Sequence, residues 1–243
     1  MRCSRRIGVV LVRCVLLGVS CVTPDDCVVV GEYGNSKLNP LVESWNGGNW
    51  SIVPSPTPAD GGTFVSVSCP KPAYCAAVGN YQTASGGNKN LAEIWNGTRW
   101  SITPIPNKPV ANLNGVSCSS STSCMAVGSY SKNHKGDTLV ESWNGKLWKF
   151  VPSPSIPEVS FDPLAGVSCV SSSRCVAVGN ANMSLVEVWN GKTWSVESSG
   201  NKGEGDYLVG VSCTSPTKCV AAGCYTYDGP KEGFVTKTLV ESS

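Results

Sequence analysis

The chain has 243 residues, of which 19 are Lys or Arg and 17 are Asp or Glu, so its net charge at pH 7 is only +2. Sequence-independent binding of nucleic acid needs many phosphate contacts from Lys and Arg, so a nucleic-acid partner is not expected. No stretch is long and apolar enough to span a membrane, and the abundance of Gly, Ser, Pro and Val favours short strands joined by turns over helices.

Residues 1–15 are expected to form an N-terminal segment apart from the rest of the chain. Arginines followed by the apolar run 7–12 resemble the start of a secretory signal, but Arg13 interrupts the run and no cleavage pattern follows. Two interpretations stay open, a truncated signal or a strand that closes a larger structure. Residues 16–21 are better explained as a repeat strand, because they match 207–213. We therefore expect a truncated or mis-started N-terminus.

Residues 16–243 form a tandem repeat. The word W-N-G-x-x-W occurs four times and contains all eight tryptophans of the chain. Upstream of each copy lies a second word, V-S-C-x5-C, which occurs five times at steps of 44 to 51 residues. Because one such unit cannot bury its own apolar face, the units must stack on one another, and the repeat predicts a single domain over 16–243.

Each unit contains four extended runs bounded by turn residues. Examples, in the order of the four runs, are 115–118, 124–128, 41–45 and 50–54. Short runs rich in β-branched and aromatic residues predict strands. Proline ends the fourth run because it cannot donate a hydrogen bond to a strand ladder.

The Asn-Gly pair between the third and fourth runs predicts a hairpin, since both residues tolerate positive φ. The two tryptophans that flank the turn, such as Trp45 and Trp50, then lie on one face of the hairpin, close enough to pack. An aromatic platform for a sugar is one interpretation of these pairs. Their recurrence at the same turn in four units favours packing in the core.

Four short antiparallel strands per unit at this period predict an all-β fold, a β-propeller of four-stranded blades. Four units are complete, and the fifth ends at 239–243, before its tryptophans. A five-bladed or incomplete ring is therefore expected. In a closed ring, 7–12 is the candidate for the outer strand of the fifth blade.

The combined units, G-V-S-C…C-x-A-V-G…L-x-E-x-W-N-G-x-x-W over 16–243, resemble those of uncharacterised repeat proteins secreted by actinobacteria, within the kelch-like and sialidase-type propellers. The resemblance implies a secreted propeller and no assigned activity. The W-N-G-x-x-W hairpin stands where sialidase-like repeats carry their Asp-box. It lacks the acidic residue of that box, so no sialidase chemistry is implied.

Thirteen cysteines are too many for an ordinary cytosolic protein of this length. Ten of them form five C-x5-C pairs, whose members face each other across a hairpin at a separation that suits a disulfide. The pairs are Cys21–Cys27, Cys69–Cys75, Cys118–Cys124, Cys169–Cys175 and Cys213–Cys219. A metal site would need four ligands, and the chain has one histidine, so one disulfide per blade and an extracellular or cell-surface location are expected.

Three cysteines lie outside the pattern, Cys3, Cys14 and Cys224. A Cys14–Cys224 bond that ties the first blade to the last is a hypothesis. The single histidine, His134, has lysine neighbours and is expected to be a solvated loop residue rather than a catalytic base.

Alternating strand directions place the C-x5-C and W-N-G turns at one end of every blade and the loops of variable length at the other. Variable loops on a rigid scaffold are where binding sites usually lie. At this variable end, the second strand finishes in G-x-Tyr in four units. The candidate ligand-binding residues are Tyr33, Tyr81, Tyr130 and Tyr225. Such tyrosines would stack on sugars or contact a protein, although capping of the packing between blades is an alternative.

Two sets of acidic residues are candidates for different roles. One glutamate recurs in the third strand of all five units and is expected to accept hydrogen bonds between blades. These residues are Glu43, Glu93, Glu141, Glu187 and Glu241. Catalysis by two carboxylates needs two different environments, so acidic residues unique to single loops are the better catalytic candidates. These are Asp60, Asp137, Glu158, Asp162, Asp206 and Asp228.

The sequence therefore predicts a secreted, non-catalytic binding or scaffold module whose ligand is a surface glycan or a protein partner. No cofactor and no metal site are expected. The alternative is a hydrolase that acts on glycans through acidic residues of the variable-end loops.

Overall fold

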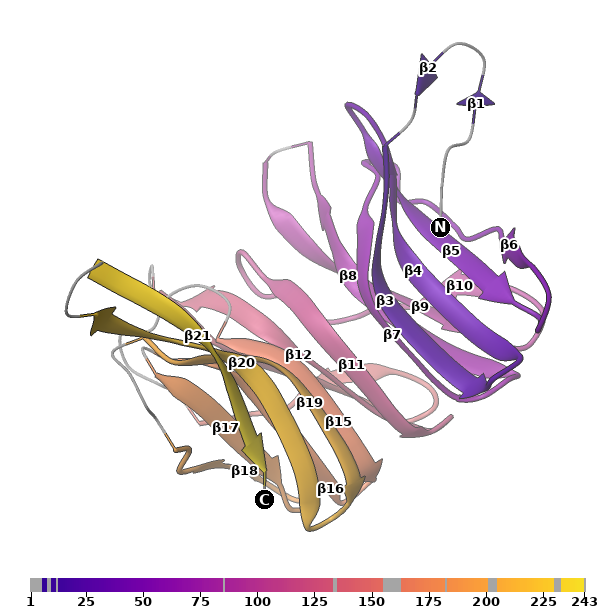
Figure 1. Ribbon diagram of the computed structural model, residues 1–243. Coiled ribbons are helices and arrows are strands. Elements are labelled where there is room, and N and C mark those ends of the chain that lie inside the picture. Colours follow the sequence, from indigo (N-terminus) through magenta and orange to yellow (C-terminus); the bar gives the residue numbers. More distant parts are fainter. Residues whose placement is uncertain are drawn as a thin grey trace.

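The structure is a computed structural model, and it describes residues 6–7, 10–11, 13–84, 86–132, 135–154, 163–181, 183–200, 205–229 and 233–242. These residues form strands joined by turns, and no helix among them is long and apolar enough to cross a membrane. Five antiparallel sheets follow one another around a common axis as the blades of an open arc (Figure 1). A short pair, β1 (Arg6–Ile7) and β2 (Val10–Leu11), precedes them.

In every blade the strands follow sequence order from the axis outward. Blade 1 comprises β3 (Arg13–Thr23), β4 (Asp26–Gly34), β5 (Leu38–Trp45) and β6 (Trp50–Ile52). Blade 2 comprises β7 (Thr63–Lys71), β8 (Tyr74–Gln82), β9 (Asn88–Trp95) and β10 (Trp100–Ile102). Blade 3 comprises β11 (Asn112–Ser120), β12 (Ser123–Lys132), β13 (Lys135–Trp143) and β14 (Trp148–Phe150). Blade 4 comprises β15 (Leu164–Ser171), β16 (Arg174–Asn180), β17 (Ser184–Trp189) and β18 (Trp194–Glu197). Blade 5 comprises β19 (Tyr207–Ser215), β20 (Lys218–Gly229) and β21 (Gly233–Ser242).

The N-terminal residues pair with one another. Strand β1 pairs with β2, and the ladder of β21 is with β20. The first blade strand, β3, begins at Arg13, three residues before the predicted start of the repeat. The role of residues 1–15, as a signal sequence or as a closing strand, stays a prediction.

The glycine of the A-V-G run is required by a close approach of the first two strands of each blade. In blade 3 the register of these strands shifts between Leu113 and Gly115. A Cβ atom on Gly128 would lie 1.9 Å from the carbonyl oxygen of Asn112. No side chain fits in that space, and the glycine recurs in each unit for this reason.

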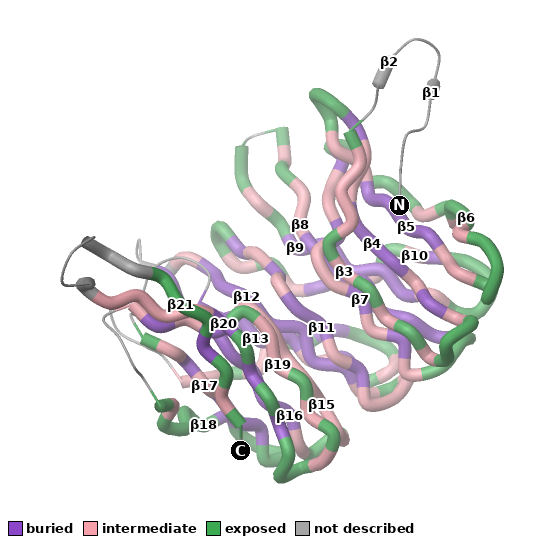
Figure 2. Tube along the Cα trace, in the orientation of Figure 1, coloured by how far each residue is buried: buried purple, intermediate pink, exposed green. Residues whose placement is uncertain are grey.

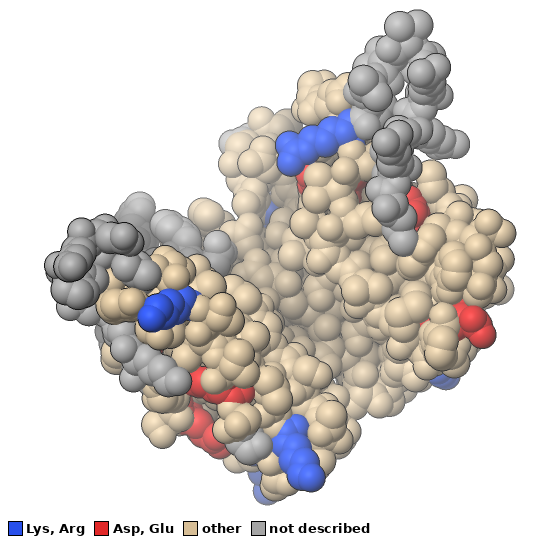
Figure 3. Space-filling view, in the orientation of Figure 1, with Lys and Arg blue, Asp and Glu red and all other residues tan. Residues whose placement is uncertain are grey.

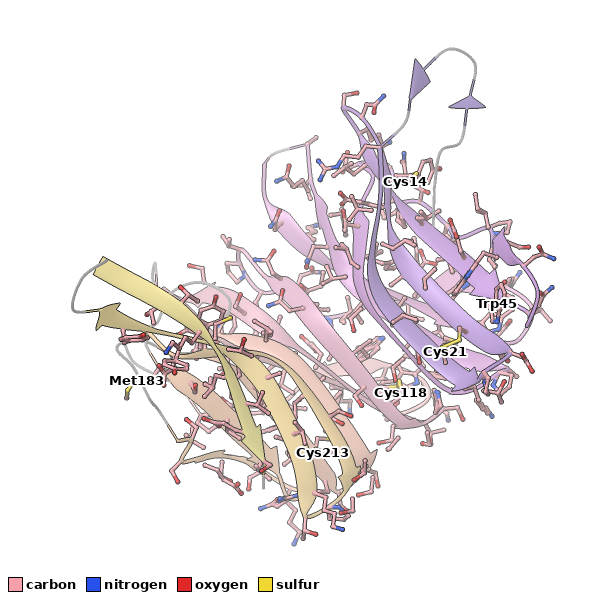
Figure 4. The ribbon with its side chains drawn as sticks, in the orientation of Figure 1. Cys14, Cys21, Trp45, Cys118, Met183 and Cys213 are labelled. Atoms are coloured by element: carbon pink, nitrogen blue, oxygen red, sulfur yellow. A yellow bond between two sulfur atoms is a disulfide. The ribbon has the colours of Figure 1, made fainter. Side chains whose placement is uncertain are left out.

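The C-x5-C pairs form disulfides at one end of every blade, as predicted. They are Cys21–Cys27, Cys69–Cys75, Cys118–Cys124, Cys169–Cys175 and Cys213–Cys219. Figure 4 shows Cys21, Cys118 and Cys213 at this end and Cys14 at the opposite end of blade 1. Cys14 is disulfide-bonded, whereas Cys224 is a free thiol. The predicted Cys14–Cys224 bond is therefore wrong, because the two residues lie in end blades that the open side of the arc separates.

The tryptophan pairs pack across the W-N-G hairpin and hold two turns together. Trp143 lies opposite Trp148 with 5.5 Å between ring centroids, and the other three pairs are separated by 5.6, 5.9 and 5.7 Å. The Nε1–H of Trp143 donates to the carbonyl of Ser121, at the tip of the C-x5-C hairpin. Asn144 Oδ1 accepts two backbone N–H bonds of the turn, and Gly145 has a φ of 90°. The pairs of blades 3 and 4 are buried in the core, as the sequence favours, whereas Trp45 and Trp50 of blade 1 are half-buried.

Each blade has a forward face toward the next blade and a rear face toward the previous one. On the forward face of blade 2, Ala76 and Val78 are fully buried against Leu113 and Leu139 on the rear face of blade 3. Equivalent apolar clusters lie between blades 1 and 2, 3 and 4, and 4 and 5. The core is therefore a series of layers between blades, coloured purple in Figure 2.

The serine of the V-S-C motif links each blade to the next. In four places its Oγ accepts a hydrogen bond from the backbone N–H of the cysteine in the following blade. The pairs are Ser20–Cys69, Ser68–Cys118 and Ser117–Cys169 at 2.9 Å and Ser168–Cys213 at 3.0 Å. The residue before the motif is glycine in four blades, and a Cβ atom on Gly166 would lie 3.3 Å from the Cα of Gly210. Blade 2 has Ser66 at this position, and its Oγ accepts a hydrogen bond from the N–H of Val116 at 3.1 Å.

The arc is open between blade 1 and blade 5 (Figure 1). Its inner strands pack on one another in the order β3, β7, β11, β15 and β19. Blade 5 has three strands among the described residues, and each of the other blades has four. The prediction of an all-β propeller with four complete blades, one partial blade and one disulfide per blade is confirmed.

Candidate ligand-binding cleft

A hollow of about 540 Å³ opens at the variable end, where blades 1, 2 and 3 meet. We name it the Tyr81 cleft after its one aromatic side chain. Its walls come from the β4–β5 loop, the β6–β7 linker, the β8–β9 hairpin and the starts of β7 and β11. The lining residues are Ser36, Lys37, Leu38, Asp60, Gly62, Thr63, Val65, Asn80, Tyr81, Gln82, Asn88 and Asn112.

The β6–β7 linker is fixed as one wall of the cleft by bonds to blade 1. Lys37 Nζ donates to the carbonyl of Ala59 at 2.6 Å, and the N–H of Gly62 donates to the carbonyl of Leu38 at 2.8 Å. Gly61 has a φ of 89°, and a Cβ atom on it would lie 2.2 Å from the Leu38 oxygen. Glycine alone fits at this position, so the Gly-Gly pair determines the shape of the wall.

Amide side chains line the opposite wall and are held in place by hydrogen bonds. Asn88 Nδ2 donates to Asn112 Oδ1 at 2.9 Å. Asn80 donates to the carbonyl of Leu113 and accepts from its N–H. These bonds join blades 2 and 3. Tyr81, which is half-buried and packs against the apolar cluster between blades 1 and 2, lines the same hollow, so an aromatic residue and a fixed polar surface border one space. Such a surface offers hydrogen-bond donors, acceptors and an apolar ring face together.

A second, smaller hollow of about 250 Å³ is also lined by Tyr81. Its walls are mainly apolar. They consist of Pro58, Tyr81, Asn90, Leu91, Ala92, Ile102, Thr103, Pro104, Ile105 and Asn107. Tyr81 therefore borders open space in two directions, one polar and one apolar.

Tyr130 occupies the same position in blade 3, but its surroundings are filled and it is only 8% exposed. Lys108 Nζ lies 5.6 Å from the centroid of its ring and 4.1 Å from that of Phe150, which packs against Tyr130 edge-on. Its hydroxyl donates to Asp137 Oδ2 at 3.2 Å. Burial and the charge of Asp137 raise the pKa of Tyr130. These contacts come from blade 3 itself and from the linker before it, and Tyr130 also belongs to the apolar cluster between blades 2 and 3.

The other two predicted tyrosines, Tyr33 and Tyr225, are half-buried. Tyr33 lies opposite Asn39 on β5, and Tyr225 stacks on Tyr227 with 6.1 Å between ring centroids. The four tyrosines lie at the same end of four different blades and do not converge on one point. Their common role in ligand binding stays a prediction, and the cleft involves one of them.

Of the three predicted catalytic carboxylates whose side chains the structure describes, one lies in the lining of the cleft. Asp60 is exposed there and is the single acidic residue of the lining. Asp137 and Asp206 are buried, with 7% and 0% exposure. Glycoside hydrolysis usually needs two carboxylates that flank the bond, and the described lining supplies one. The remaining candidates lie outside the described residues or have side chains outside them: Glu158, Asp162 and Asp228. His134, expected to be a solvated loop residue, also lies outside the described residues.

Four of the repeated glutamates are buried, with exposures of 9% for Glu43 and 0% for Glu93, Glu141 and Glu187, whereas Glu241 is half-buried. Glu93 Oε2 accepts a hydrogen bond from Ser55 Oγ, in the β6–β7 linker, at 2.9 Å, and the expected hydrogen bonds between the blades themselves stay a prediction. The carboxylates of Glu141 and Glu187 have no hydrogen-bond partner among the described residues. Burial raises the pKa of Glu93 to about 7 and those of Glu141 and Glu187 to about 8. These side chains therefore hold protons near neutral pH.

No group of three or more His, Cys, Asp or Glu residues that could hold a metal ion occurs in the described parts of the chain. Ten of the cysteine sulfurs are instead joined in the five blade disulfides.

Sequence reasoning singled out the tyrosines and missed the amides of the cleft. The variable loop 82–90 supplies Gln82 and Asn88, and its concentration of amides is a signal visible in the sequence. Asn112 comes from the next blade, and a single sequence does not show that it faces Asn88.

Several solved structures are similar to the chain over most of its length. The structure of U3-55K has 14% sequence identity and a TM-score of 0.57, and the match covers 89% of this chain and 61% of that one. YCF48 bound to a D1 peptide has 14% identity and a TM-score of 0.54, covering 97% and 72%. A fucose-recognising lectin of Aleuria aurantia, a six-bladed β-propeller, has 9% identity and a TM-score of 0.56, covering 93% and 78%.

These likenesses define the class of fold, a β-propeller, and the chain spans less than two thirds of the length of U3-55K. A scan against models of protein families found no match, and a search of curated proteins found none.

Proposed function

We propose that the protein is a non-catalytic carbohydrate-binding propeller whose ligand occupies the Tyr81 cleft. The observation that carries this proposal is the half-buried ring of Tyr81 beside fixed amides in a hollow of about 540 Å³. Ligand sites for small molecules commonly have volumes in this range and a few fixed polar groups. A sugar presents C–H groups to an aromatic face and hydroxyls to amides, and the cleft has partners for both.

The charges of the cleft favour a neutral sugar. Lys37 and Asp60 are its two charged lining residues, one of each sign. Lys37 Nζ already donates to the carbonyl of Ala59, which holds it at the wall. The carboxylate of Asp60 would repel an anionic sugar, and the lining has no excess of positive charge to offset this repulsion. A neutral glycan would not be repelled.

The likeness to the Aleuria aurantia lectin supports a carbohydrate ligand at the level of the fold, because that propeller recognises fucose. Propellers host many unrelated functions, so the sugar recognised by the lectin is not transferred to this chain.

The proposal includes a location outside the cytoplasm. Five disulfides form and persist in oxidising compartments. The assignment to secreted actinobacterial repeat proteins, within the kelch-like group, is part of the same proposal and is supported by the combined G-V-S-C and W-N-G-x-x-W motifs.

The test is a binding screen of the oxidised protein against neutral and anionic glycans, followed by titration of the hits. Tyr81→Ala is expected to weaken binding about tenfold or more, the loss of one well-packed aromatic contact. Tyr81→Phe keeps the ring and should retain most of the affinity. No saturable binding to any glycan would refute the carbohydrate proposal.

A matched control is Tyr33→Ala, which removes the equivalent tyrosine of blade 1 outside the cleft lining. Binding should survive this change. Equal losses in Tyr33→Ala and Tyr81→Ala would instead assign the ligand to a surface that spans the ring of tyrosines.

A further inference from the structure

The forward face of blade 5 exposes apolar side chains that are buried in the other blades. Val220 and Val240 are 49% and 59% exposed. The residues at the same register positions of blade 2, Ala76 and Ala92, are 0% and 1% exposed because blade 3 covers them. Figure 2 shows the resulting exposed stretches on β20 and β21.

The rear face of blade 1 is open in the complementary way. Val19 is 63% exposed, whereas its counterparts Val67 and Val116 are each 6% exposed under the preceding blade. The two ends of the arc therefore present the two halves of one type of interface, which the chain itself forms four times.

The serine–cysteine hydrogen bonds between inner strands are absent at the same two faces, the forward face of blade 5 and the rear face of blade 1, among the described residues. The serine Oγ in each of blades 1–4 accepts a hydrogen bond from the cysteine N–H of the following blade. Ser212, the serine of blade 5, is exposed, and no atom lies within 4 Å of the position of a Cβ on Gly210. At the other end, Cys21 is exposed as well.

We propose that the open side of the arc is a docking surface for one further blade of the same repeat type. The four internal interfaces specify its chemistry. Its rear face carries two leucines like Leu113 and Leu139 against Val220 and Val240, and its cysteine N–H donates to Ser212. Its forward face covers Val19 in the way that small apolar side chains cover Val67.

A single blade suits the open side better than a second copy of the whole arc. A second copy docked through the same interface would place its own second blade where blade 1 stands. Figure 3 shows one hollow between the two end blades, with few charged side chains on its visible walls. The match to the six-bladed lectin covers 78% of that chain, near the share that five blades of six would give.

The test supplies such a blade from the chain's own sequence. Residues 143–197 are added directly after Ser242, which corresponds in register to Ser142. The added segment provides a fourth strand for blade 5 and a complete copy of blade 4. The melting temperature is expected to rise by several degrees. The matched control carries Leu164→Asp and Leu185→Asp in the added copy, which places charges on its rear face and should abolish the rise.

Ser212→Ala gives a second test. An extension that folds without docking on blade 5 would not make the stability of the extended chain depend on Ser212. In the extended chain the substitution should lower the melting temperature by about 2–4 °C, and Ser168→Ala should have the same effect, because both serines then accept a hydrogen bond. In the original chain it should have no measurable effect.

Three results would overturn the proposal. One is an extended chain that melts where the original does. The second is an extended chain in which Ser212→Ala changes nothing. The third is a loss of stability from Ser212→Ala in the original chain, because the surface would then already be covered. Sedimentation would show whether the cover is the chain's own first blade or a second copy.

Discussion

Blades 2 and 3 have the same motifs but differ at the variable end. Tyr81 of blade 2 borders the open cleft, whereas Tyr130 of blade 3 is buried beneath Lys108 and Phe150. The linker sequences decide the difference, since Lys108 lies in the linker before blade 3 and the Gly-Gly pair in the linker before blade 2. A repeated position therefore has a structural role in one blade and is available for a ligand in another.

The largest expected contrast is in the cost of removing each tyrosine. Tyr130→Ala should lower the free energy of unfolding by about 3 kcal/mol, because it leaves a cavity and removes the hydrogen bond that Asp137 Oδ2 accepts. Tyr81→Ala should cost less than about 1 kcal/mol, since its ring borders open space. Urea unfolding of the two variants measures both values. Equal losses would mean that the two sites do not differ in packing.

The end of the blades that carries the disulfides should show no such contrast in stability between blades 2 and 3. Replacing both cysteines of Cys69–Cys75 or of Cys118–Cys124 by serine should cost roughly 2 kcal/mol in either blade, because each bond closes a loop of the same length. Thermal unfolding of the two double variants, each with its other disulfides intact, tests this. A large difference between the two losses of stability would show that blades 2 and 3 differ in packing beyond the variable end.

The smallest expected effect concerns pH. The pKa of Glu141 is raised by burial from 4.5 to about 8, so the folded state binds more protons than the unfolded chain between these values. Stability should therefore fall as the pH rises through this window. Glu141→Gln should reduce the fall by at least about 1 kcal/mol, the equivalent of one pKa unit. Denaturant titrations at pH 5 and pH 8.5 give the comparison.

The control for this measurement is Glu197→Gln, on the exposed outer strand of blade 4. It should leave the pH dependence unchanged. A stability that rises between pH 5 and 8.5 in the unmodified protein would contradict the assignment of a buried, protonated Glu141.

The fold could be predicted because its determinants are local. Disulfides, Asn-Gly turns and tryptophan pairs each join residues within one unit, so the spacing of Cys118, Cys124, Trp143 and Trp148 is enough to specify blade 3. The V-S-C serines of blades 1–4 form hydrogen bonds with residues 45–52 positions away in the next blade. The motif shows that the serine recurs, but it does not show which residue the serine contacts.

The cleft could be predicted only in part, since it depends on contacts between units. The G-x-Tyr pattern identifies Tyr81 and Tyr130 equally. Which of them is open follows from where Lys108 packs and from how Gly61 approaches Leu38. Those contacts are fixed by three-dimensional packing of linkers that share no common pattern, so a single sequence gives no sign of them.

The short span of the five blade disulfides has a consequence for oxidative folding. Each pair is separated by six positions, so in blades 1–4 the correct partner of a blade cysteine is also its nearest cysteine in the sequence, whereas in blade 5 Cys224 lies five positions from Cys219. Closing so short a loop has a small entropic cost, and in blades 1–4 the local concentration of the right thiol exceeds that of any other. A chain with thirteen cysteines can thus oxidise hairpin by hairpin as it emerges, with little need for an isomerase to correct mispaired bonds.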